Sequence, residues 1–181
     1  VGALEAAGIT ETSGNGKRVL ITAAAGGIGL IGIKAAKLFG AEVTATTRSP
    51  EQAERLAAHA DHAIIVNSPD DLHREARRVM PDGADAVLDP LGGEYIGAAL
   101  KSCAPAASIV SYESVTGTTG RYDVMDSLVT GASIRGHTVF HFFAARDWLA
   151  HLIDLGLRHA DALRPIVAAD LPYSDAPKAF A

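Results

Sequence analysis

The chain has 181 residues, of which 48% are hydrophobic and 20% are charged, and its formal net charge is −5. This balance is typical of one globular domain, and the lack of a basic run argues against a nucleic-acid partner. The sequence has no apolar run long enough to span a bilayer, no signal-peptide pattern, and a single cysteine, which excludes an intrachain disulfide. We therefore expect a cytoplasmic protein that binds neither nucleic acid nor membrane.

Both ends of the chain lie within helical patterns, since it starts at Val1 without Met and stops at Ala181. Natural domains usually end in exposed, polar segments. We therefore expect a fragment of a longer polypeptide.

After a short predicted helix over residues 1–8 and a polar turn, residues 17–40 predict a buried strand, a tight glycine turn and a helix. The apolar, β-branched run that starts at Val19 indicates the strand. Apolar residues spaced by three and four from Ile28 onward indicate the helix.

The turn follows the G-x-G-x-x-G pattern of dinucleotide-binding domains, with Ala24 in the first place. A pyrophosphate must approach the backbone N–H groups at the helix N-terminus, where unpaired donors and the helix dipole favour anions. Glycine permits this approach because it lacks a Cβ, and it tolerates a positive φ. We predict pyrophosphate contacts from Ala25, Gly26, Gly27, Ile28 and Gly29. The competing interpretation is a glycine-rich turn that binds nothing.

A second strand is predicted over residues 42–47, and Thr47, Arg48 and Ser49 end it. A site selective for NAD carries Asp or Glu here to bind the adenosine ribose, whereas NADP needs a cation for the 2′-phosphate. The first acid is Glu51, while Arg48 can form a forked contact with phosphate and its two neighbours offer hydroxyl groups. We therefore predict NADP(H), the alternative being a solvated surface arginine.

The rest of the chain continues the alternation of helices and strands. Proline at helix starts, amphipathic spacing and short apolar runs predict helix 50–59, strand 62–66, helix 70–79, strand 84–88, helix 94–101, strand 108–112, helix 123–130, strand 132–138 and helix 144–156. After residue 157 the pattern changes to a strand-like piece, 163–167, and a final helix.

Six strands alternate with helices, and the strands are continuously apolar, as expected where both faces are covered. The predicted fold is therefore α/β: a Rossmann-type, doubly wound, parallel six-stranded sheet with helices on both faces. Ligands of such sheets bind beyond the carboxyl ends of the strands. We expect one cleft lined by the loops there: 24–29, 47–49, 67–68, 89–93 and 111–114.

The histidines and the cysteine form no recognisable metal or nucleophile pattern. His137 and His141 are four residues apart but lack carboxylate or thiolate partners at metal-ligand spacing, so no metal site is predicted. Cys103 is expected to be a small, partly buried residue, because nothing marks its thiol as activated. No catalytic acid or base is assigned, and the Tyr-x-x-x-Lys pattern of short-chain dehydrogenases is absent.

Several stretches, in order, resemble the cofactor-binding domain of the quinone oxidoreductase branch of the medium-chain dehydrogenase/reductase superfamily. They are VLITAAAGGIG, AAKLFGAEV, VLDPLGG and IVSY, and the ending, with LRP and LPYSDA, resembles the return segment of this branch. The branch is zinc-independent and includes the enoyl reductase domains of polyketide and fatty acid synthases. The resemblance implies an NADP-binding Rossmann domain over 1–157 and an incomplete return segment over 158–181, towards a missing catalytic domain.

By this resemblance the protein is an NADPH-dependent reductase of a quinone, an enone or an enoyl thioester, and the fragment is expected to be inactive alone. A homodimer is implied through the sheet edge between Thr138 and Phe143. The resemblance also places the 2′-phosphate at Arg48 and the ribose and nicotinamide near residues 89–92. Together with the residues derived above, the predicted cofactor-binding set is Ala25, Gly26, Gly27, Ile28, Gly29, Thr47, Arg48, Ser49, Ser68, Asp89, Gly92 and Ser111.

Some positions depart from the family pattern. A lysine that often assists binding of the 2′-phosphate is Gln52, a tyrosine that often stacks on the adenine is Ser68, and a glycine beside the nicotinamide is Glu113. Asp70 resembles a proposed proton donor of enoyl reductase domains, but the lysine expected with it is again Gln52. The alternatives are therefore an enoyl reductase domain of a polyketide synthase and a non-catalytic NADP-binding module or redox sensor.

Overall fold

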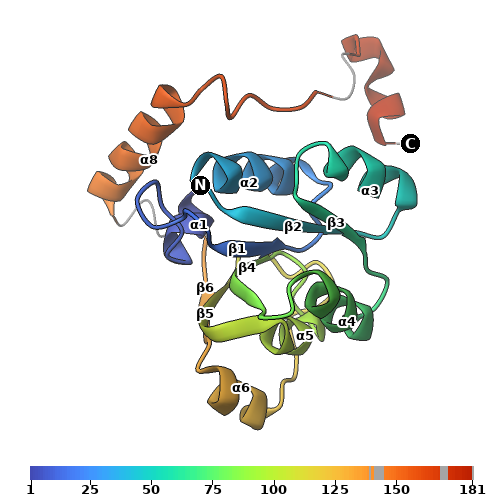
Figure 1. Cartoon of the computed structure of the whole chain (residues 1–181). Helices are drawn as coiled ribbons and strands as arrows, with labels where there is room; N and C mark the ends of the chain where they lie inside the picture. The colour runs from blue at the N-terminus through green and yellow to red at the C-terminus, as the bar shows by residue number, and fades with distance from the viewer. Residues whose placement is uncertain (139, 141–144, 168–170, 181) are drawn as a thin grey trace.

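The computed structural model describes residues 1–138, 140, 145–167 and 171–180. Its framework is a six-stranded sheet in the order β3-β2-β1-β4-β5-β6, and every pairing between neighbouring strands is parallel (Figure 1). The strands are β1 Arg18–Ile21, β2 Glu42–Thr47, β3 His62–Ile65, β4 Ala84–Asp89, β5 Cys103–Ser111 and β6 Ser133–Gly136. This is the strand order of a Rossmann fold, so the predicted fold class is confirmed.

Helices cover both faces of the sheet (Figure 1). They are α1 Gly2–Ala6, α2 Gly27–Leu38, α3 Pro50–Ala57, α4 Pro69–Val79, α5 Tyr95–Lys101, α6 Val124–Thr130 and α8 Arg146–Arg158, with a 3₁₀ helix, η1, at Tyr173–Phe180. One buried cluster joins α1, α2, α3 and α8 to one face of the sheet, and a second joins α4 and α5 to the other.

The continuous apolar strands follow from this two-sided burial. Successive side chains of a strand point to opposite faces. Val19 and Ile21 accordingly belong to the cluster under α2, whereas Leu20 belongs to the cluster under α4 and α5, and all three are fully buried.

Three helices start directly at the carboxyl ends of strands, but their caps differ. Ser49 caps α3 by accepting a hydrogen bond from the Gln52 N–H, and Ser68 caps α4 by accepting one from the Asp71 N–H. In α2 the cap position is Gly26, and no side chain caps this helix. The first N–H groups of α2 are therefore left for solvent or a ligand.

Two predicted strands differ from the structure by more than two residues. Strand β5 starts at Cys103 rather than at residue 108, because Cys103 pairs with Ala84 ahead of a register shift in which Ala106 adopts a φ of 60°. Pro105 in this stretch made a strand start look improbable from propensity alone. Residues 164–167 belong to no strand; Pro165 lacks the N–H that a ladder would require. Residue 144, the predicted start of the helix observed as α8, lies outside the described residues.

Candidate functional site

A cleft of about 500 Å³ opens at the carboxyl ends of β1, β2, β3 and β4. We call it the central cleft. It is lined by Ala23, Ala25, Gly26, Thr46, Thr47, Arg48, Gln52, Val66, Asn67, Leu91, Tyr95, Val115 and Thr116. Its position between loops that follow neighbouring strands is the one at which doubly wound sheets bind ligands.

The glycine turn is folded back onto β2. The Ala23 N–H donates to Thr46 Oγ1 at 3.1 Å, and the Ala24 N–H donates to the Thr46 carbonyl at 2.8 Å. Ala23 takes a left-handed φ of 48° to make this turn. At Gly29 a Cβ would lie 2.5 Å from Ala24, so close packing between the turn and α2 requires glycine there.

Gly26 and Gly27 face open space instead. A Cβ at Gly27 would meet no protein atom within 4 Å, and one at Gly26 would meet only the Ala23 carbonyl at 4.0 Å. Both residues are exposed at the uncapped start of α2. The space beside these glycines is not filled by protein atoms, and it lies next to uncapped helix N–H groups. Such a place suits a phosphate or pyrophosphate.

The end of β2 brings a positive charge to the cleft. Arg48 is exposed, and no described residue forms an ion pair with it. Thr47 beside it is buried and donates from Oγ1 to Gln52 Oε1 at 2.6 Å. Among the described residues lining the cleft, Arg48 is the only charged one, so the cleft attracts anions.

The acidic residue nearest to Arg48 in sequence, Glu51, is hydrogen-bonded to Ser49 rather than paired with Arg48. The Glu51 carboxylate accepts a hydrogen bond from Ser49 Oγ, which lowers the Glu51 pKa. Ser49 is thus occupied with capping α3 and holding Glu51, and neither residue is among those that line the central cleft.

Asp89 is fully buried, and its carboxylate holds the loop after β4 in place through hydrogen bonds. Its Oδ1 accepts from Thr22 Oγ1 at 2.6 Å and from the Leu91 N–H at 3.2 Å, and its Oδ2 accepts from the Gly92 N–H at 3.0 Å. The carboxylate therefore joins the ends of β1 and β4 and leaves no free surface for direct contact with a ligand. Gly92, with a φ of 63°, completes the bend of this loop.

The predicted residues fall into separate groups. Ala25, Gly26, Thr47 and Arg48 line the central cleft. Gly27 and Ile28 line a neighbouring apolar hollow of about 980 Å³ instead, together with residues of α1, α8 and Tyr112. Ser111 ends β5, where its Oγ donates to the Glu113 carbonyl at 3.4 Å, and Ser68 caps α4.

Sequence reasoning missed several lining residues. Asn67 and Leu91 lie in loops that were expected at the cleft, so the strand ends could have indicated them. Tyr95 and Thr116 gave no local signal, because they reach the cleft from the start of α5 and from the loop after β5.

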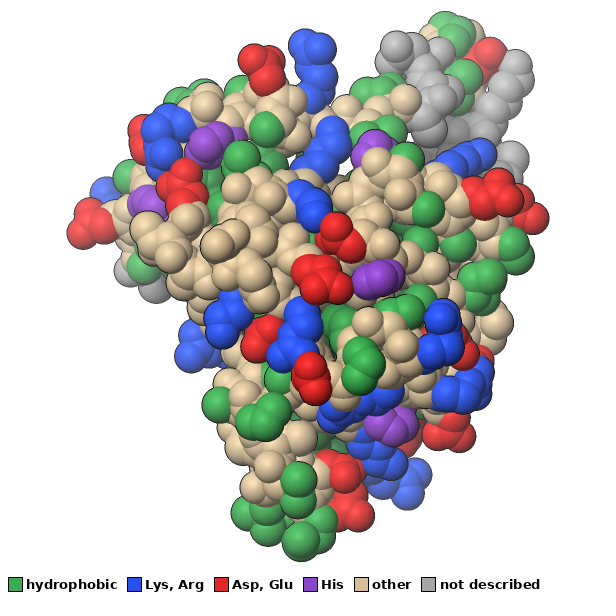
Figure 2. Space-filling view, viewed as in Figure 1, with side chains coloured by type: hydrophobic (Ala, Val, Ile, Leu, Met, Phe, Trp, Pro, Cys, Tyr) green, Lys and Arg blue, Asp and Glu red, His purple; other side chains and the backbone are tan. Residues whose placement is uncertain are grey.

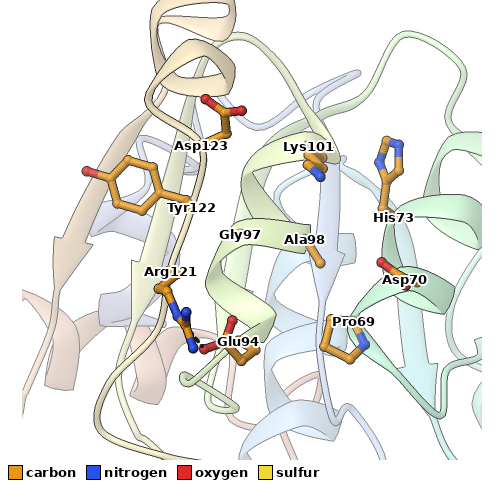
Figure 3. Close-up of a pocket in the computed structure, with 10 residues that line it drawn as sticks. All are labelled: Pro69, Asp70, His73, Glu94, Gly97, Ala98, Lys101, Arg121, Tyr122 and Asp123. Atoms are coloured by element: carbon orange, nitrogen blue, oxygen red, sulfur yellow. Dashed lines mark ion pairs between the residues drawn. The ribbon is translucent and has the colours of Figure 1, made fainter.

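A third hollow, of about 420 Å³, lies between α4, α5 and residues 121–123 (Figure 3). Asp70 lines it with His73 and Lys101, and Arg121 pairs with Glu94 at 3.6 Å. Asp70 thus lies in a different hollow from Gln52, which lines the central cleft. The two positions that resembled an acid–lysine pair do not share a cavity.

Within the described ranges, no three His, Cys, Asp or Glu side chains are grouped so that they could hold a metal ion. His137 packs edge-on against Trp148, with ring centroids 5.5 Å apart, and His141 lies outside the described residues. In the same part of the chain, no helix is both long and apolar enough to cross a bilayer.

The strand order, the glycine turn and the cleft at the strand ends together define a Rossmann-type domain. The zinc-binding dehydrogenase family matches residues 27–156, and the chain belongs to this family. The predicted relationship to the medium-chain dehydrogenases and reductases is thereby confirmed. The described residues do not fit the zinc of the family's name, so we assign no role to a metal.

Individual relatives share this domain. The chain is 30% identical over 172 residues to the spectinabilin polyketide synthase system protein NorB of Streptomyces orinoci, covering 91% of this chain and 8% of that protein. It is 32% identical over 110 residues to acryloyl-coenzyme A reductase of Sulfurisphaera tokodaii, covering 60% and 31%. A mycobacterial protein solved in complex with NADPH is 25% identical, with a TM-score of 0.68 over 83% of this chain and 52% of that one. The chain thus spans about half or less of the length of these relatives.

Proposed function

We propose that the chain is the cofactor-binding domain, 1–157 with a return segment over 158–181, of an NADPH-dependent oxidoreductase. The proposed reaction is hydride transfer to a quinone or to the carbon–carbon double bond of an enone or enoyl thioester. The observation that carries the proposal is the unpaired Arg48 in a cleft whose other described lining residues are uncharged, beside the open space at Gly26 and Gly27. The NADPH complex of one relative and the acryloyl-coenzyme A reductase activity named for another support it.

The residues of this chain bind and orient the cofactor. The N–H groups at the start of α2 would hold the pyrophosphate, and Arg48 would hold the 2′-phosphate. Asp89 keeps the loop with Leu91 and Gly92 in place on the ribose and nicotinamide side. NADPH itself supplies the hydride, so this domain needs to position it rather than to provide an acid or base.

The test is an equilibrium titration of NADPH and NADH with the wild-type protein, Arg48→Ala and Arg48→Lys. The wild type should prefer NADPH. Arg48→Ala should weaken NADPH binding about tenfold or more and leave NADH unchanged, because a charge-assisted contact to phosphate is lost. Arg48→Lys should recover only part of the loss, since lysine lacks the forked geometry. Equal affinities of the wild type for the two cofactors would contradict the proposal.

A non-catalytic NADP-binding module or redox sensor stays the alternative, but Cys103 does not support a sensor that acts through a thiol. Cys103 is buried, and burial raises its thiol pKa to about 12, so it carries almost no thiolate at neutral pH. A single buried cysteine fits a reducing compartment, and the cytoplasm is the location we propose.

We also propose a homodimer through the β6 edge of the sheet. All four residues of β6 are exposed, and its described ladder partner is β5 alone. The adjacent helix α6 exposes Val124, Met125, Leu128 and Val129, each by at least 60%. Figure 2 shows hydrophobic side chains gathered at this end of the molecule. Thr138, at the start of the edge expected from sequence, is exposed; most of residues 139–143 lie outside the described residues.

A further inference from the structure

The adenine end of the central cleft lacks the aromatic residue expected after β3. That position is Ser68, and its hydroxyl is committed to capping α4, where it accepts from the Asp71 N–H at 3.1 Å. A base held only by Arg48 and the glycine turn would have no flat surface to stack on. The structure brings an aromatic ring to the cleft from another element.

That ring is Tyr95, the first residue of α5. Its backbone N–H donates to the Gly92 carbonyl at 3.1 Å, which ties it to the loop that Asp89 fixes. The Tyr95 side chain is partly buried against the cluster under α4 and α5, and the residue also lines the central cleft. A ring held in this way loses little freedom when a ligand binds.

The walls around Tyr95 suit a neutral, flat heterocycle. Arg48 comes from the end of β2, Val66 and Asn67 from the end of β3, and Leu91 from the loop after β4. Val66 and Leu91 are apolar, and the exposed Asn67 side chain offers an amide that can both donate to and accept from a base edge. The charge stays at Arg48, where the 2′-phosphate is proposed.

The Tyr95 hydroxyl remains protonated at neutral pH. Burial raises its pKa, the nearby Arg48 charge acts in the opposite direction, and the Asp71 carboxylate raises it further. The hydroxyl can therefore donate a hydrogen bond while the ring supplies a stacking face.

We propose that Tyr95 is the aromatic wall of the adenine subsite and sets the affinity of this chain for the adenosine half of its cofactor. The inference rests on the proposed function, because it assumes a dinucleotide in the central cleft. It assigns the stacking role to α5 rather than to the position after β3. Base–aromatic stacking contributes enough free energy for its loss to be measured as about a tenfold change in affinity.

The experiment titrates NADPH, NADH and reduced nicotinamide mononucleotide, which lacks the adenosine, with four proteins: wild type, Tyr95→Leu, Tyr95→Phe and Tyr122→Leu. Tyr95→Leu should weaken NADPH and NADH by the same factor, about tenfold, and leave the mononucleotide unchanged. Tyr95→Phe keeps the ring and should stay within about twofold of wild type. Tyr122 is an exposed tyrosine of the α4–α5 hollow, so its replacement should change none of the three affinities.

The outcomes separate this inference from the proposed function. A wild type that binds neither dinucleotide overturns both. If the wild type binds NADPH and the folded Tyr95→Leu variant binds it with the same affinity, only the Tyr95 inference is overturned. If Tyr95→Leu fails to fold, nuclear Overhauser contacts in the wild type decide: contacts between adenine protons and a tyrosine ring that persist in Tyr122→Leu support the inference, and their absence refutes it.

Discussion

At the scale of single residues, the loop beside the cleft depends on a carboxylate that is fully buried, that of Asp89. Asp89 receives three hydrogen bonds from the ends of two strands while having no exposed surface. A buried donor that loses its acceptor is left without a hydrogen bond to protein or to water, and the protein is destabilised by the desolvation free energy of that donor. Asp89 is therefore a positioning residue for the loop that carries Leu91 and Gly92.

We expect Asp89→Ala to lower the free energy of unfolding by about 2 kcal/mol, because the buried Thr22 hydroxyl and the half-buried Leu91 and Gly92 N–H groups lose this acceptor. Asp89→Asn keeps the shape and one acceptor oxygen and should lose less. Urea unfolding at pH 7 measures both, and Asp161→Ala, at an exposed position, serves as the control. If Asp89→Ala has the same free energy of unfolding as the wild type, the loop does not depend on the hydrogen bonds to Asp89.

At the scale of elements, long-range contacts set boundaries that local propensity does not. Arg77 of α4 donates to the carbonyls of Lys101, Pro81 and Cys103 at 2.9 to 3.0 Å. These contacts hold the start of β5 against α4, in a stretch where a proline argues against a strand. Asp85 in turn joins the starts of β1 and β4 by accepting from the Arg18 backbone N–H at 2.8 Å and from Arg18 Nε at 3.1 Å.

This pairing predicts a pH dependence of stability. Burial raises the pKa of Asp85, but the hydrogen bonds and charge of Arg18 outweigh it and bring the pKa below the usual 3.8. A carboxyl group with a lowered folded-state pKa stabilises the fold above its unfolded-state pKa, and this stability is lost as pH falls through the folded-state value. The difference in unfolding free energy between wild type and Asp85→Asn should therefore be largest near pH 7 and shrink below about pH 4.

Urea unfolding at a series of pH values measures that difference. Asp82→Asn is the matched control, because Asp82 also contacts Arg18, at 3.7 Å, but its side chain is 92% exposed. The control should show little difference from wild type at any pH. A wild-type advantage over Asp85→Asn that stays constant down to pH 3 would contradict the prediction.

At the scale of the whole molecule, α8 returns to the start of the chain. Glu5 accepts from Trp148 Nε1 at 2.9 Å and lies 2.8 Å from His151 Nε2, and Glu11 contacts Arg158 and His159. The β6 edge lies near these elements, because Arg135 of β6 donates to the Ala6 carbonyl at 3.1 Å and His137, just after β6, packs against Trp148 of α8. The apolar surface of α6 lies at the other end of the molecule from α8 (Figure 1). We therefore expect a second copy of the chain to contact the exposed apolar residues of α6 rather than α8.

If the β6 edge forms a homodimer, a charge on α6 should disrupt it. Sedimentation equilibrium should find a dimer for the wild type and a monomer for Val129→Glu, because burying an unpaired carboxylate is costly. Leu157→Glu, on α8, changes an equally exposed apolar residue (73% against 76%) and should remain dimeric. A wild type that stays monomeric at every concentration would refute the dimer.

Local sequence patterns were sufficient to predict most of the helices and strands and the fold class. Buried strands carry continuous apolar runs, helices carry a 3.6-residue period, and the turn before α2 needs glycine. Each of these features depends on residues that are close together in the sequence. The same local logic pointed to Ala25, Gly26, Thr47 and Arg48, which the structure brings to one cleft.

The other side chains of that cleft are brought together by the packing of segments that are distant in the sequence, which local patterns do not reveal. Tyr95 enters it and Ser68 does not, and Asp89 turns out to be buried under its own loop. The strands pair in the order β3-β2-β1-β4-β5-β6, so residues that meet at the cleft are separated by tens of positions along the chain. Hydrophobic periodicity specifies which face of an element is buried, but it carries no information about which distant side chain lies opposite.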